Sequence, residues 1–95
     1  MYGGTVNEEK KETIKVMPAQ SFDEDIAGAY VATTSNLKLR AGANTKYDVL
    51  ASVPKGGKVQ CYGYYTKESG GTVWLYVVYN EKVGFISKRY LLSQK

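Results

Sequence analysis

Short runs in which apolar and polar residues alternate are the strongest constraint on how this chain folds. In the first, Leu37 and Leu39 alternate with Lys38 and Arg40. The same alternation recurs at residues 49–53, 59–62, 74–79 and 83–86. A period of two over a few residues is typical of half-buried antiparallel strands. Clusters of turn-forming residues separate the runs, at 42–44, 54–57, 69–71 and 80–82.

The length of the chain limits the architecture that these strands build. A chain of 95 residues is enough for one small domain, and it contains no repeated unit. So short a strand-rich segment cannot build a full two-layer sandwich. We therefore predict an all-β fold for residues 29–95, a small, partly open β-barrel of about five to six antiparallel strands.

Residues 1–28 have a different composition. Residues 1–15 are dense in charge and poor in apolar side chains, which predicts a flexible leader or linker. Residues 16–28 are expected to form an extended segment with a short helical turn that packs on the barrel. Ser21 and Glu24 have capping-box spacing for this turn, and Phe22 and Ile26 need an apolar surface to cover.

Charge is divided unevenly between these two parts. Residues 1–28 contain three lysines against six acidic residues, whereas residues 29–95 contain ten Lys or Arg against three acidic residues. A basic domain suggests an anionic partner such as nucleic acid, an acidic membrane or wall teichoic acid. A surface charged only for solubility explains the same numbers.

Catalytic constellations are missing from the sequence. The chain has no histidine, which zinc amidases and cysteine peptidases need. Cys61, the only cysteine, falls at an inward position of its run and is interpreted as a small buried hydrophobe. Nothing positions Asp48, Glu68 and Glu81 as a carboxylate pair. We expect no enzymatic activity, no metal and no cofactor in the isolated chain.

Several segments resemble the bacterial SH3-like (SH3b) domain in their order and spacing. The opening motif of that family resembles Leu-Lys-Leu-Arg-Ala-Gly-Ala-Asn-Thr-Lys-Tyr at residues 37–47. The following turn, last hairpin and closing strand resemble residues 53–59, 74–86 and 87–91. The sequence departs from the family at Asn80-Glu81, where Asn-Gly is common. Because glutamate disfavours the left-handed conformation, a longer or bulged loop is expected there.

The resemblance implies an SH3-like barrel that binds bacterial cell wall. Such domains commonly lie at the C-terminus of autolysins and phage endolysins, and the stretch before the barrel is similar to that of some Firmicutes phage amidases. It implies an attached catalytic domain upstream, such as an N-acetylmuramoyl-L-alanine amidase. The expected partner is peptidoglycan peptide or glycan, or teichoic acid.

Two groups of residues are candidate ligand sites. If the strands around residues 58–64 and 74–79 pair, alternation places four aromatic side chains on one outer face: Tyr62, Tyr64, Trp74 and Tyr76. Three explanations remain open for such a face, namely packing of the leader over it, ligand binding and self-association.

The second candidate is the loop that begins at Arg40. Its guanidinium suits a bidentate contact with phosphate or carboxylate, or a surface salt bridge. By resemblance, the ligand groove extends to Asn44, Lys46, Tyr47 and Tyr90.

Location follows from the same features. The first 15 residues lack the apolar region of a signal peptide, and no run approaches the roughly 20 apolar residues of a membrane span. We expect no membrane partner and action at the cell wall, reached by phage lysis or by a signal on a parent protein. The alternatives are a basic, aromatic barrel that binds single-stranded nucleic acid, which the motifs favour less, and a self-associating structural module.

Overall fold

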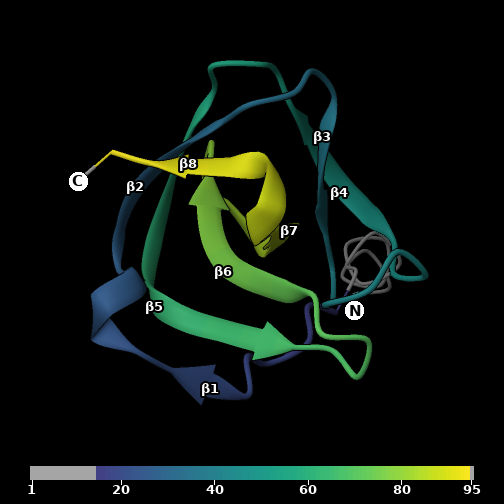
Figure 1. The fold of residues 1–95 in the computed structure, drawn as a ribbon. Coiled ribbons are helices and arrows are strands. Elements are labelled where there is room, and N and C mark those ends of the chain that lie inside the picture. The colour runs from purple at the N-terminus through teal and green to yellow at the C-terminus, as the bar shows by residue number, and fades with distance from the viewer. Residues whose placement is uncertain (1–14, 95) are drawn as a thin grey trace, which may run out of the picture.

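Eight antiparallel strands form the fold of residues 15–94, which are the residues that the computed structural model describes (Figure 1). The strands are β1 (Ser21–Phe22), β2 (Gly28–Ala32), β3 (Leu37–Arg40), β4 (Val49–Val53), β5 (Lys58–Lys67), β6 (Val73–Tyr79), β7 (Lys82–Ser87) and β8 (Leu91–Ser93). They pair in the order β4-β3-β7-β6-β5-β2-β8, with β1 on β5. The predicted all-β, partly open SH3-like barrel is confirmed, and the short β1 and β8 raise the strand number above the expected one.

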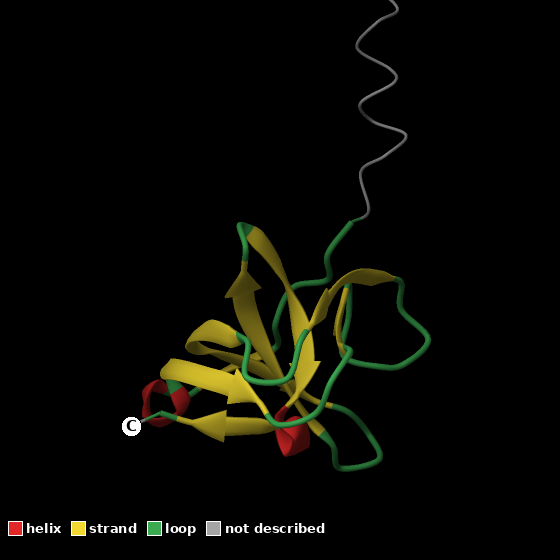
Figure 2. Cartoon of the chain, turned by 90° about the horizontal axis from the view of Figure 1, so that it is seen from above, coloured by secondary structure: helices red, strands yellow, loops and turns green. Residues whose placement is uncertain are grey.

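Two short 3-10 helices, η1 (Glu24–Ile26) and η2 (Lys88–Tyr90), are the only helical turns of the described chain, and they appear in red in Figure 2. No helix within residues 15–94 is long and apolar enough to cross a membrane.

The core of the barrel consists of the inward-facing residues of the alternating runs. In β3, Leu37 and Leu39 are buried while Lys38 is exposed, as the period of two requires. The buried cluster comprises Tyr30, Ala32, Leu37, Leu39, Val53, Val59, Cys61, Leu75, Val77 and Ile86. The predicted inward position of Cys61 therefore holds. Burial of each large apolar side chain contributes about 1.5–3 kcal/mol to folding.

Strand β5 is strongly curved (Figure 1), and Gly63 has a positive φ within it. The pairing of β5 with β6 shifts register between Cys61 and Tyr65. Gly63 has φ +100°, and a Cβ at this position would lie 2.7 Å from Cε1 of Phe22. Glycine is therefore required twice, by the left-handed backbone and by the close approach of β1.

The segment before β2 lies against the barrel. Its helical turn η1 is capped by Asp23, whose Oδ1 accepts from the Asp25 amide at 2.9 Å. The predicted cap at Ser21 is wrong, because Ser21 pairs with Tyr65 in β1 and its backbone is committed to a strand. The predicted flexible leader at 1–15 lies almost wholly outside the described residues.

The turn between β6 and β7 contradicts the expectation of a longer loop. Tyr79 pairs directly with Lys82, so the hairpin has a two-residue turn. Asn80 and Glu81 both have positive φ, 50° and 67°. Packing of β6 and β7 in the core fixes the register, and Glu81 accepts the left-handed conformation that the turn then requires.

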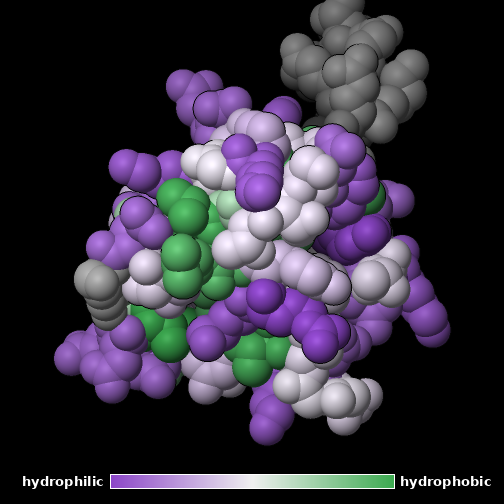
Figure 3. All heavy atoms as spheres, turned by 45° about the horizontal axis from the view of Figure 1, so that its top comes forward, coloured by the Kyte–Doolittle hydropathy of each residue, from purple (hydrophilic) through white to green (hydrophobic). Residues whose placement is uncertain are grey.

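Hydrophilic side chains dominate the face shown in Figure 3, and its hydrophobic atoms gather in a limited area. Eight large apolar or aromatic residues are exposed over the described chain: Met17, Phe22, Tyr47, Val49, Tyr62, Tyr64, Tyr90 and Leu92. Several of these border the cavities described next.

Candidate functional site

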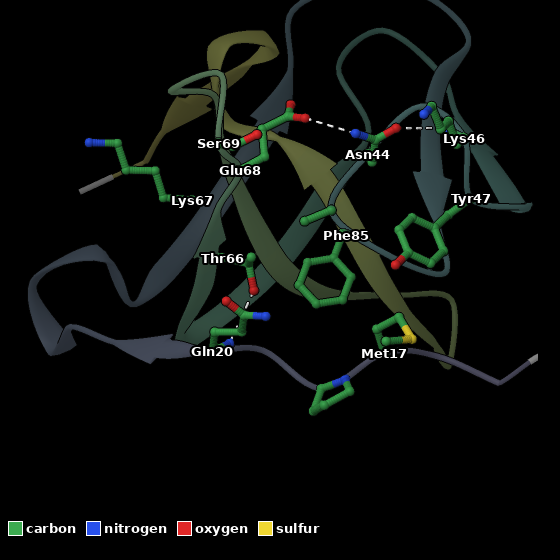
Figure 4. A pocket seen from close by; sticks show the side chains of 12 residues that line it. Met17, Gln20, Asn44, Lys46, Tyr47, Thr66, Lys67, Glu68, Ser69 and Phe85 are labelled. Atoms are coloured by element: carbon green, nitrogen blue, oxygen red, sulfur yellow. Dashed lines mark hydrogen bonds between the residues drawn. The ribbon is translucent and has the colours of Figure 1, made fainter.

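A groove of about 490 Å³ opens over Phe85 of β7, and Figure 4 shows its lining side chains. One wall is the loop between β3 and β4, at residues 43–47. The opposite wall is the end of β5 and the turn after it, at residues 66–69. Phe85 of β7 lies between the walls, and Met17 lies along the side (Figure 4). Pro18 also lines the groove. We call this hollow the groove.

The loop wall is held in place by Arg40. Its Nη1 donates to the carbonyl oxygens of Thr45 and Tyr47, at 3.0 and 3.1 Å. Arg40 forms no salt bridge with any residue between 15 and 94. The loop turns back toward the guanidinium, so the carbonyl oxygens of Thr45 and Tyr47 accept the hydrogen bonds that a carboxylate could have accepted. The loop is thereby ordered without a ligand.

Glu68 ties the loop to the opposite wall. Its Oε2 accepts from Asn44 Nδ2 at 2.9 Å, and its Oε1 accepts from Trp74 Nε1 at 2.9 Å. Asn44 Oδ1 accepts from the Lys46 amide at 2.8 Å, which fixes the orientation of the Asn44 amide group (Figure 4). We call the Asn44–Glu68–Trp74 arrangement the carboxylate clamp. It makes the groove a preformed hollow between two connected walls.

The sequence reasoning missed the role of Glu68. It weighed this residue only as a catalytic carboxylate. One signal was available, because a tryptophan in a covered strand needs an acceptor for its indole N–H, and Glu68 lies just across the turn. The roles of Phe85 and Thr66 were also missed, because both are ordinary strand residues in the sequence.

The segment before β1 forms the third side of the groove. The Met17 amide donates to the Ala41 carbonyl at 2.7 Å, and the Gln20 amide donates to Thr66 Oγ1 at 3.0 Å. The segment from Met17 to Gln20 is thus tied to the chain after β3 at one end and to β5 at the other (Figure 4). Proline has no N–H and needs no partner at this position.

The chemistry of the groove is suited to binding. Lys46 and Lys67 supply positive charge beside the carboxylate of Glu68, and Tyr47 supplies exposed aromatic surface next to the buried Phe85. Within residues 15–94, no group of His, Cys, Asp and Glu side chains is placed to hold a metal ion. Open hollows with aromatic surface and a few charged groups orient a ligand.

The proposed outer aromatic face does not exist as expected. Trp74 is only 5% exposed, because the carboxylate clamp and the loop cover it. Tyr76 is half-buried and packs on Phe85 with ring centroids 5.0 Å apart. Tyr62 and Tyr64 are exposed at the bend of β5, and Phe22 of β1 packs on Tyr64 with ring centroids 5.0 Å apart. The bend and the loop, neither visible in the alternation, divide the four rings.

The candidate ligand residues predicted around the loop are divided between two cavities. Asn44, Lys46 and Tyr47 line the groove. Arg40, Trp74 and Tyr90 line a second cavity of about 300 Å³ on the other side of the loop, together with Ser87. The two cavities share the loop as a common wall.

Comparison with known proteins gives one match. The family model described as Bacterial SH3 domain matches residues 35–91, which is more than half of the chain. A search of curated proteins and a search of solved structures each found no match. The match spans β3 to η2 and so covers both walls of the groove, the loop and the closing hairpin. The chain therefore belongs to the bacterial SH3 domain family.

Proposed function

We propose that this chain is a non-catalytic module that binds bacterial cell wall through the groove. The observation that carries the proposal is a preformed groove, with aromatic surface and two lysines, in a member of a family whose domains often bind cell wall. Peptidoglycan peptide, its glycan, and wall teichoic acid are the candidate polymers. The groove adds affinity and no chemistry, and it raises the local concentration of an attached enzyme at its substrate.

The geometry supports an extended ligand. The groove is bounded by two walls held together by the carboxylate clamp, so the free chain already has the shape that a bound polymer needs. Tyr47 is 39% exposed beside the groove and offers a ring for apolar stacking. Lys46 and Lys67 supply charge for carboxylate or phosphate groups of the polymer.

Co-sedimentation with purified cell walls tests the proposal. Tyr47→Ala should weaken binding about 5- to 100-fold, the range of a lost stacking contact. Tyr62→Ala is the matched control, since it removes a more exposed tyrosine at the bend of β5, away from the groove. Equal folding of both variants is checked by thermal unfolding. Loss of binding in Tyr62→Ala with full binding in Tyr47→Ala would place the site at the bend.

The same assay at two salt concentrations separates charge from stacking. The screening length falls from about 10 Å at 0.1 M to about 3 Å at 1 M salt, so the contribution of Lys46 should vanish and that of Tyr47 should remain. Lys46→Gln is the appropriate charge variant, because Arg40 also holds the loop. Walls stripped of teichoic acid show whether the charged ligand is that polymer. Unchanged binding on stripped walls would assign the ligand to peptidoglycan.

The proposal places the chain at the cell wall beside a peptidoglycan hydrolase, with an amidase as the expected parent. Isolated chain should release no reducing ends or amines from peptidoglycan. A single-stranded oligonucleotide column provides the control for basic barrels that bind nucleic acid. Retention of the wild-type chain on that column, together with no binding to purified walls, would overturn the proposal.

A further inference from the structure

The second cavity has a composition that the groove does not share. It lies beside the outer face of β3 and contacts β6, β7 and the residues after β7. Lys38 and Arg40 contribute two cationic side chains to its lining, and none of the described residues that line it is acidic. Neither cation forms an ion pair within residues 15–94. The cavity lining is therefore net positive, and the Glu68 carboxylate that accepts from Trp74 Nε1 is engaged in the carboxylate clamp.

The two cations lie on one face of one strand. Lys38 and Arg40 are two residues apart in β3, so both point away from the core that Leu37 and Leu39 fill, roughly 7 Å apart along the strand. Arg40 is already fixed by its Nη1 bonds to the loop carbonyls. Its remaining N–H donors have no partner among the described residues, and a guanidinium held in this way is preorganised for an oxyanion.

Ser87 supplies an independent observation. It lines the same cavity and is only 6% exposed, and its Oγ has no hydrogen-bond partner within residues 15–94. A buried hydroxyl without a partner is unfavourable, and nearly all such groups in proteins are satisfied. It is positioned at the end of β7, opposite Trp74 in the sheet register. A hydrogen-bond acceptor bound in the cavity could accept from this hydroxyl.

Tyr90 completes the polar rim. Its ring lines the cavity and is 41% exposed, and the Arg89 guanidinium carbon lies 5.8 Å from the ring centroid. Arg89 thus adds a third positive charge near the opening. The lining of one small cavity thus combines cations with hydroxyl groups that can donate to an oxyanion.

The geometry points to a phosphate-binding site formed by Lys38, Arg40, Ser87 and Tyr90, separate from the groove. The ligand class is a phosphate group, either inorganic or esterified. The site shares only the loop wall with the groove, so the two can be occupied at once. This inference does not rest on wall binding, because phosphate binding is measured on the chain alone.

Titration of the isotope-labelled chain with inorganic phosphate and with glycerol phosphate, followed by amide chemical shifts, tests the inference. Saturable shifts are expected at residues 36–40, 45 and 87–90. Acetate is the second arm, and binding of acetate as tight as that of phosphate would overturn the assignment to phosphate. Shifts that follow the surface lysines generally and do not saturate would overturn the site itself.

Two variants locate the site within the fold. Ser87→Ala should weaken phosphate binding about tenfold, the effect of losing a hydrogen bond to a charged group. It should leave the melting temperature unchanged or raised, because the removed hydroxyl has no partner among the residues that the structure describes. Lys38→Gln should weaken binding about threefold, as expected for an exposed charge.

Lys82→Gln is the matched control. It removes one exposed lysine at the turn end of the β6–β7 hairpin, roughly 16 Å along the strand from Ser87. Phosphate affinity should not change in this variant. Equal losses in Lys82→Gln and Lys38→Gln, or wild-type affinity in Ser87→Ala, would refute the site.

Discussion

Replacement of Glu68 by glutamine breaks the carboxylate clamp without changing its size. Both carboxylate oxygens accept a hydrogen bond, from Asn44 Nδ2 and from Trp74 Nε1. Glutamine has one oxygen and one NH₂ group, so it can accept from only one of these donors. Asn44 cannot compensate by rotating its amide group, because its oxygen already accepts from the Lys46 amide.

The expected loss of stability is that of one hydrogen bond to a charged group. A hydrogen bond to a charged group is worth about 1.5–3 kcal/mol. Glu68 and Asn44 are partly exposed, so water replaces part of the lost interaction. We expect Glu68→Gln to lower the free energy of unfolding by about 1–1.5 kcal/mol. For a domain of this size the melting temperature should fall by about 4–12 °C.

Urea and thermal unfolding measure this loss, and wall co-sedimentation measures its effect on the groove. Glu81→Gln is the matched control, because Glu81 is exposed in a turn and forms no side-chain hydrogen bond within the described chain. A Glu68→Gln variant within about 0.5 kcal/mol of the wild type, the scatter of ordinary surface changes, would refute the clamp. Equal losses in both variants would point to net charge as the cause.

Four further substitutions have defined outcomes. Glu81→Gly should raise the free energy of unfolding by about 0.5–1 kcal/mol in urea, because glycine relieves the left-handed backbone; destabilisation would contradict the two-residue turn. Gly63→Ala should destabilise by about 1–3 kcal/mol, since its Cβ would meet Phe22, and a neutral result would exclude the tight bend. Burial raises the pKa of the Tyr30 phenol, so stability present below about pH 10 should be lost as the pH rises through the folded-state pKa; Tyr30→Phe should remove this part of the alkaline decline. Trp74→Ala should lower the free energy of unfolding by about 3–5 kcal/mol, as measured by far-UV circular dichroism in urea, and a loss below about 1 kcal/mol would show that the indole is not packed.

The strands and their inward faces were predictable from the sequence. Leu37, Leu39, Val53, Val59 and Cys61 are buried as their alternation requires. This succeeds because the period of two is a local property of the extended backbone, and a mixed apolar and polar strand has only one face to bury. The turn clusters also fall between strands, since Gly, Pro and Asn act on their own backbone.

The candidate site was predictable only in part. Asn44, Lys46 and Tyr47 were selected by resemblance and lie together on the groove. The alternation placed Trp74 on the outer side of β6 but could not show that a loop covers it. Exposure depends on segments that are distant in the sequence.

The sequence by itself determined an all-β barrel, the facing of most strand residues and membership of an SH3-like family, because these depend on short-range periodicity and motif order. Only the tertiary structure decided what each outward-facing side chain meets. The bend at Gly63 separates Tyr62 and Tyr64 from Trp74. The clamp at Glu68 joins two loops 24 residues apart. Ser87 Oγ has no hydrogen-bond partner among residues 15–94, in a cavity formed by four separate segments. These are contacts between distant parts of the chain, and local propensity carries no information about them.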